Sequence, residues 1–422
     1  MEWLKNIALP QSAEHIELLG YMLMIVLLLF IIFSGIILWG TLLSIYLKKK
    51  ESKNLDAKYR RLSKEIMNIV LFNKTTGIMF CVLPIMTIII IFAQLFQSQN
   101  NSNLDFLAYS LILLLISLLL IYSYKNSLYD FRQVDINSGL IGSIIMFLSL
   151  WFFSTAMTSS VFTESSQTIN NTVNLFSSAV IIRFILLLLI SVALVGAVIV
   201  FGIFSLKDTE PESDEEYAGL AKEVPLKAAF IASVFIPLFV LIDMMMLPKS
   251  SLSGTFFFYL ILGLVFLFII YHLLYLLYKK INKTTSAYLL AAIILFILTY
   301  VINDQLLISG SNRVHYATLT TNFETYLAEL KGTDKVPVIN AEEIYKVSCS
   351  SCHAFDKKLV GPPHNEVIPK YFDNANQLVA FIRNPVRVNN EYPPMPNPGL
   401  KPDEAKAVAE YVILKVKESI GQ

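Results

Sequence analysis

Eight long apolar segments fill the N-terminal 306 residues and limit what this chain can fold into. They lie at about 18–47, 75–97, 105–124, 139–159, 178–206, 227–247, 255–278 and 285–306. A helix needs about 20 residues to cross about 30 Å of hydrocarbon, and each segment is long enough. A helix also pairs its own backbone polar groups, which a bilayer requires. The sequence therefore predicts an all-α fold that begins with an eight-helix transmembrane bundle over residues 1–306.

The composition agrees with a membrane protein. Hydrophobic residues make up 55% of the 422 residues and charged residues only 15%, whereas soluble domains average about 25% charged residues. The net charge is +1 and no basic stripe is present. We therefore expect membrane lipids as surroundings and no nucleic-acid partner.

Charged loops indicate how the bundle is oriented. The loop after the first segment contains "KKKESKNLDAKYRRLSKE" and the loop after the seventh contains "KKINK", whereas "QSQNNSN" and "TESSQTINN" on the opposite side contain no Lys or Arg. Lys and Arg concentrate on the cytoplasmic side. The first segment is too long for a signal peptide, so we interpret it as a retained helix. The even number of spans then places both termini outside the cytoplasm.

A short motif near the C-terminus, "VSCSSCHA", contains two of the three cysteines, Cys349 and Cys352, followed by His353. The spacing C-x-x-C-H is typical of covalent haem c attachment. Haem c is attached on the outer side of a bacterial membrane, which agrees with the side predicted from the loops. The third cysteine, Cys81, lies in an apolar run and is expected to be a small buried hydrophobic residue.

The sequence around the motif indicates a small helical domain. A short amphipathic helix, with Ile344 and Val347 as expected core contacts, leads into the motif. "LVGPP" follows, then a Pro-rich loop containing Met395. A final amphipathic helix has apolar residues at helical spacing, namely Ala405, Val408, Ala409 and Val412.

Taken together, residues 338–422 resemble a class I monohaem cytochrome c, in the attachment motif, the G-P-P turn, the Met in the loop and the final helix. The resemblance implies one covalently bound haem c, with thioethers to Cys349 and Cys352. It also implies His353 as the proximal iron ligand and Met395 as the distal ligand. The carbonyl of Pro362 would accept a hydrogen bond from the other nitrogen of His353.

Two histidines compete with Met395 for the distal position. His364 follows His353 by eleven residues, which is a short distance for reaching the opposite face of a haem, and His315 precedes the domain. With Met395 as ligand, protein fills both axial positions and leaves no site for a substrate at the iron. Electron transfer is therefore the expected chemistry.

Ionisable residues inside transmembrane segments are candidates for function, because burying a charge in lipid is costly. Arg183, Asp243 and Asp304 fall near the predicted outer ends of their segments, and Glu14, His15 and Glu17 open the first one. Arg183 and Asp243 could form a structural ion pair or, with His15, a quinol or proton site. His15 could equally be a surface residue. His15 and His272 lie at opposite leaflets, which argues against a bis-His b haem within this chain.

Residues 307–337 are predicted to tether the haem domain, with a helix in their middle ending at Gly332. In plan, the chain is similar to membrane-anchored cytochrome c subunits of bacterial respiratory complexes. We therefore expect an electron-carrying subunit rather than a self-sufficient enzyme, in the bacterial inner membrane with its haem on the periplasmic side. Other complex subunits and a soluble or membrane redox partner are the expected partners. The alternatives are a quinol:cytochrome c oxidoreductase, with quinone bound in the bundle, and a haem-gated transporter or sensor.

Overall fold

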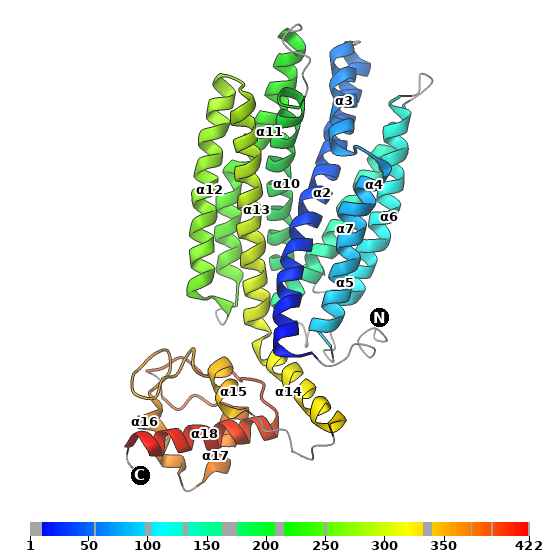
Figure 1. The fold of residues 1–422 in the computed structure, drawn as a ribbon. Coiled ribbons are helices and arrows are strands. Elements are labelled where there is room, and N and C mark those ends of the chain that lie inside the picture. Colours follow the sequence, from blue (N-terminus) through cyan, green and yellow to red (C-terminus); the bar gives the residue numbers. More distant parts are fainter. Residues whose placement is uncertain are drawn as a thin grey trace. The chain divides into compact units, whose positions relative to one another are not determined.

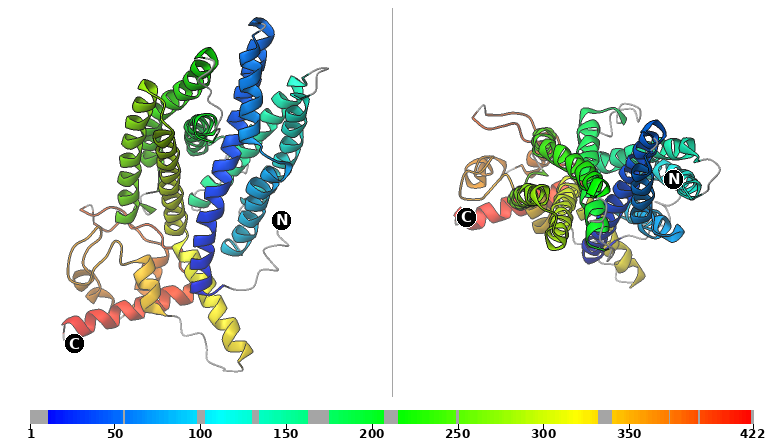
Figure 2. Two further views of the ribbon diagram at one scale, coloured as in Figure 1. Left: turned by 45° about the horizontal axis from the view of Figure 1, so that its top comes forward. Right: turned by 90° about the horizontal axis from the view of Figure 1, so that it is seen from above.

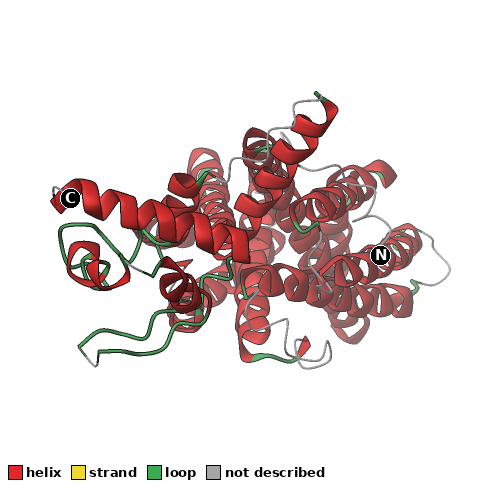
Figure 3. Cartoon of the chain, turned by 90° about the horizontal axis from the view of Figure 1, so that it is seen from below, coloured by secondary structure: helices red, strands yellow, loops and turns green. Residues whose placement is uncertain are grey.

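The computed structural model describes residues 11–54, 56–97, 103–129, 134–162, 175–206, 215–248, 251–331, 340–372, 374–389 and 391–420. Throughout these residues the regular structure is helical, with no strand (Figure 3). The contacts divide the chain into two compact units, built mainly from Leu19–Ser311 and from Asn312–Gln422. The predicted all-α architecture is confirmed.

The first unit contains, in the described residues, eight helical segments long and apolar enough to cross a membrane (Figure 1). Seven are single helices: α2 (Ala13–Asn54), α6 (Asn103–Ser127), α7 (Ile136–Val161), α10 (Ser178–Phe204), α11 (Glu215–Met246), α12 (Gly254–Lys279) and α13 (Lys283–Ser311). The remaining segment runs through α4 (Lys74–Gly77), the π-helical turn η1 (Ile78–Val82) and α5 (Leu83–Leu95). The amphipathic helix α3 (Ala57–Val70) lies between α2 and α4. The chain is thus a multi-pass membrane protein.

Polar side chains begin several of these helices and join neighbouring ones. Ser177 and Ser253 cap α10 and α12 by accepting hydrogen bonds from Val180 N and Phe256 N, which pairs backbone donors that would otherwise have no partner. Between α6 and α7, the hydroxyls of Ser110 and Ser149 each donate to the other's backbone carbonyl. Small polar residues allow helices in a membrane to approach closely in this way.

Helices α10 and α11 pack side by side (Figures 1 and 2) and approach closely at Gly196. A Cβ atom at this position would lie 2.6 Å from the carbonyl oxygen of Pro225. Only glycine fits such a backbone contact without displacing a helix. Cys81 is fully buried in η1, as predicted.

The second unit contains α14 (Arg313–Leu330), α15 (Ala341–Ser348), α16 (His364–Val367), the 3-10 turn η4 (Pro369–Tyr371), α17 (Ala375–Arg383) and α18 (Pro402–Ile420). Its core lies between α15, α17 and α18. On α15 Ile344 is buried as expected, but Val347 is only half-buried and Tyr345 takes the second core position. The apolar residues predicted on the final helix are all buried in this core, namely Ala405, Val408, Ala409 and Val412.

The segment interpreted as a tether is helical over most of its described length. The boundary between the two units falls after Ser311, and α14 occupies Arg313–Leu330. Residues 332–339 lie outside the described part of the chain, and with them the predicted helix end at Gly332. The tethering role stays a prediction.

Candidate functional site

The C-x-x-C-H motif forms a tight turn directly after α15. Asn340 caps this helix by accepting from Glu343 N, and the helix ends at Ser348. Beyond it, Cys352 N and His353 N both donate to the carbonyl oxygen of Cys349, at 3.1 and 2.9 Å. The turn therefore holds the two cysteines and the histidine together. Both cysteines are half-buried, and neither is in a disulfide.

Two neighbouring residues fix the ring of His353. Its Nδ1 lies 3.0 Å from the carbonyl oxygen of Pro362. Because a carbonyl can only accept, Nδ1 carries the proton and Nε2 keeps a lone pair suited to a metal. Gly361 allows this arrangement, since a Cβ there would lie 2.3 Å from Cε1 of the ring.

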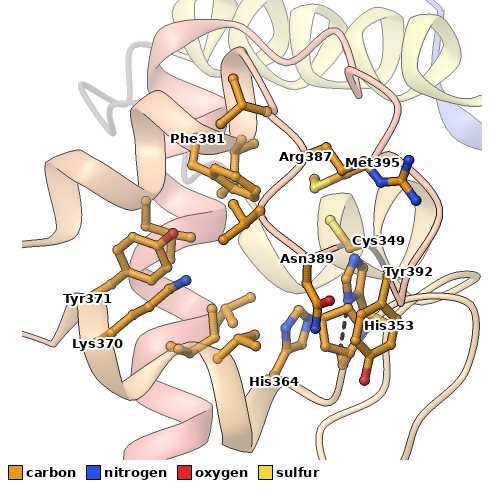
Figure 4. A pocket seen from close by; sticks show the side chains of 18 of the residues that line it. Cys349, His353, His364, Lys370, Tyr371, Phe381, Arg387, Asn389, Tyr392 and Met395 are labelled. Carbon is orange, nitrogen blue, oxygen red and sulfur yellow. Dashed lines mark hydrogen bonds between the residues drawn. The ribbon is translucent and has the colours of Figure 1, made fainter.

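His353 faces a cavity of about 190 Å³ that is partly open to solvent (Figure 4). Most of its lining is apolar, from residues such as Ile368, Leu378, Phe381, Val408 and Val412. Polar groups come from Lys370, Arg387, Asn389 and Tyr392. A large apolar pocket with a few polar groups is the usual character of a cofactor site.

Three further residues predicted for the haem site, Cys349, Pro362 and Met395, belong to the same lining as His353. Met395 comes from a Pro-rich segment without helical structure. Its half-buried side chain reaches the cavity wall from a part of the chain 42 residues beyond His353 (Figure 4). The fold thus brings the predicted distal ligand and the predicted proximal ligand to one cavity.

The arrangement places a thiol, an imidazole and a thioether around this cavity. Burial raises the pKa of the Cys349 thiol to about 12, with a smaller contribution from nearby Cys352. At neutral pH this sulfur is therefore a protonated thiol rather than a reactive thiolate. The chemistry of the three groups fits a haem c, which binds through thioethers and takes imidazole and thioether axial ligands.

His364 also lines the cavity, where its ring stacks on that of His353. It is buried, and neither ring nitrogen has a hydrogen-bond partner among the described residues. Burial, together with the nearby His353, lowers its pKa to about 4, so the ring is neutral at pH 7. Sequence reasoning treated His364 only as a competing ligand. Its stacking depends on how the loop folds back, which the sequence pattern did not indicate.

In the first unit, the structure brings together Arg183 and Asp243, two of the three residues predicted for a quinol or proton site. Arg183 Nε lies 3.1 Å from Asp243 Oδ1. Arg183 Nη1 lies 3.0 Å from Oδ1 of Asp304, which completes a buried cluster of three charges. His15 is exposed in the first turn of α2, and the described residues lining the cavities beside the cluster do not include it.

Comparison with known proteins identifies the haem-motif region. A family model described as "Cytochrome C oxidase, cbb3-type, subunit III" matches residues 337–412. Cytochrome c-551 of Pseudomonas denitrificans is 38% identical over 77 residues, which cover 17% of this chain and 93% of that protein. Cytochrome c-551 of Azotobacter vinelandii is 42% identical over 76 residues, with the same two coverages.

Through this domain, the chain belongs to the cytochrome c family. The cytochrome c domain implies a haem c cofactor and an electron-transfer function. The family model matches only within the C-terminal domain, and each relative matches 17% of this chain, so the transmembrane bundle lies outside what these comparisons cover. The predicted combination of a cytochrome c domain with upstream membrane helices is confirmed.

Proposed function

We propose that this protein is a membrane-bound c-type cytochrome that relays single electrons as a subunit of a multisubunit respiratory complex. The observation that carries the proposal is the cavity that has Cys349, His353 and Met395 in its lining. A haem c bound there supplies a one-electron couple between ferric and ferrous iron.

Each residue has a role that follows from its chemistry. Cys349 and Cys352 would hold the haem covalently through thioethers, and His353 would present Nε2 to the iron. The 3.0 Å contact from Nδ1 to Pro362 supports this role, because it fixes the tautomer and the ring orientation. Met395 would supply a thioether ligand to the iron, and such a ligand favours ferrous iron and raises the reduction potential.

We propose Met395 rather than His364 as the second residue that would bind the iron. His364 is stacked nearly parallel to His353, so its ring packs against the proximal ligand instead of facing it across a haem. With His353 and Met395 as ligands, the iron would have no open position for a substrate. This supports electron transfer rather than catalysis at the iron.

The basic loops support a location for the domain. Lys and Arg concentrate in the loops after the first and seventh spans, which the positive-inside rule assigns to the cytoplasm. We infer an inner-membrane protein of a bacterium, with its haem domain on the periplasmic side. The bundle then docks other complex subunits.

Native purification tests this proposal. The full chain is extracted from native membranes in mild detergent, and co-purifying subunits and visible spectra are determined. We expect other redox subunits to co-purify. We also expect the haem to be reduced or oxidised much more slowly when these subunits are removed. A chain that arrives alone and exchanges no electrons with any partner would contradict the proposal.

A second candidate is a quinol:cytochrome c oxidoreductase with its own quinol site. It is favoured by one observation, the buried Arg183–Asp243 pair beside cavities within the bundle. A quinol gives up two electrons and one haem accepts one, so a further acceptor would be required. Reduction of the haem by a quinol analogue, in the purified chain without partners, would support this candidate over the first.

A further inference from the structure

The buried cluster in the bundle has unequal numbers of positive and negative groups. The guanidinium of Arg183 pairs with both Asp243 and Asp304, and the three residues come from three helices, α10, α11 and α13. The side chains of the two aspartates are each 11% exposed and that of Arg183 is 5% exposed. One cation and two carboxylates leave one negative charge uncompensated.

The cluster lies between two cavities. One has a volume of about 20 Å³ and the other about 40 Å³, and both are lined by Arg183, Tyr300 and Asp304. The first also reaches α2 and α7, which contributes Thr158 to its wall. The second also reaches α11, through Asp243, and α12. Of the described residues lining either cavity, Arg183 is the only cation.

A second observation points to a ligand on the α7 side. Thr158 is 3% exposed, and its hydroxyl has no hydrogen-bond partner among the described residues. It lines the same cavity as Asp304. A buried hydroxyl without a partner is costly, and a protonated carboxyl or a water beside it would provide one.

We propose that the cluster is a proton-binding site, with one proton held at the Asp304 carboxyl on the Thr158 side. Two carboxylates that share a site do not both stay ionised in a low-dielectric environment unless both charges are compensated. Taking up a proton leaves Arg183 and one carboxylate as a balanced pair. The site exchanges this proton with water, for which the two cavities are large enough. It depends on neither the haem nor a quinol.

Infrared spectroscopy of the full-length protein in lipid nanodiscs tests this proposal. The carbonyl stretch of a protonated carboxylic acid is compared between wild type and variants at neutral pH. We expect the difference spectra to show the loss of one protonated carboxylic acid in both Asp304→Asn and Asp243→Asn. In each variant the remaining aspartate is ionised, because its charge is balanced by that of Arg183. The control Glu223→Gln, at an exposed residue of α11 paired with Lys227, should leave the band unchanged.

Two further variants and a comparison of two salts make the test sharper. Arg183→Gln should double the number of protonated acids, because neither aspartate then has a cation; if this variant does not fold, the two aspartate variants still decide. Thr158→Val, of similar volume, should shift the acid band without removing it. An unchanged band in Asp304→Asn would overturn the proposal. So would a band that sodium chloride abolishes and choline chloride does not, which would assign the site to Na⁺.

Discussion

The ring of His364 stacks on that of His353, with centroids 4.9 Å apart and planes inclined by 12°. The contact places both histidines in the same part of the cavity lining, while Met395 reaches it from the Pro-rich segment (Figure 4). This stacking decides which residue we propose as the distal ligand. Because His364 packs against His353, Met395 is the candidate that comes from a different part of the cavity lining.

Replacing Met395 therefore tests the ligand assignment. In Met395→Ala we expect loss of the methionine–iron charge-transfer band, a lower reduction potential and binding of CO to the ferrous iron. The control His364→Phe keeps a stacked ring and should retain the band. Visible spectra and a redox titration of the full-length protein measure these effects. Retention of the band in Met395→Ala would refute the assignment.

Gly361→Ala should disturb the proximal side. The new Cβ would lie 2.3 Å from Cε1 of His353, so the ring must move away from its position against Pro362. Overpacking of this kind costs about 1–3 kcal/mol. We expect a lower thermal midpoint, followed through the haem absorbance, whereas Lys357→Ala at an exposed residue of the same loop should have little effect. Equal thermal midpoints for Gly361→Ala and Lys357→Ala would contradict the close contact between Gly361 and the ring of His353.

Cysteine substitutions separate covalent attachment from packing. Cys349→Ser and Cys352→Ser should each weaken retention of haem on a denaturing gel, and the double variant should lose it. Cys81→Ser is the matched control, because Cys81 is buried in η1 of the other unit. Its haem staining should equal that of wild type. Full staining of the double variant would show that the haem is held elsewhere.

The close approach of α10 and α11 predicts a stability difference between two glycines. Gly196→Ala places a Cβ 2.6 Å from the backbone oxygen of Pro225, whereas Gly219 in α11 has no atom within 4 Å of the corresponding position. We expect Gly196→Ala to cost about 1–3 kcal/mol and Gly219→Ala to be neutral or stabilising. Thermal unfolding of the purified chain measures both. A neutral Gly196→Ala would argue against this helix contact.

Sequence patterns predicted the elements better than their mutual contacts. Continuous apolar runs were sufficient for the eight spans, and helical spacing was sufficient for the buried face of α18. Arg183, Asp243 and Asp304 were all predicted near the same leaflet, but the predicted quinol or proton site left Asp304 out, because its contact with Arg183 depends on how α13 is rotated toward α10. The same depth argument could have added Asp304 to the candidate site.

In the core of the cytochrome c domain, too, the sequence pattern predicted the helix but not all of its contacts. On α15, Tyr345 rather than Val347 is buried, because its ring packs against those of Phe355, His364 and Tyr411. These three rings come from separate parts of the chain, so the helical pattern of α15 alone does not indicate that they meet. Spacing along one helix predicts which face is apolar, whereas the choice between two apolar positions depends on the partners that the fold supplies.

The most direct test of the electron-relay proposal is the visible and far-red spectrum of the purified full-length protein in both oxidation states, with haem quantified per chain. We predict one covalently bound haem c that is low-spin in both states, shows the methionine–iron band when ferric, and does not bind CO when ferrous. A chain without covalent haem, or a ferrous iron that binds CO readily, would contradict it.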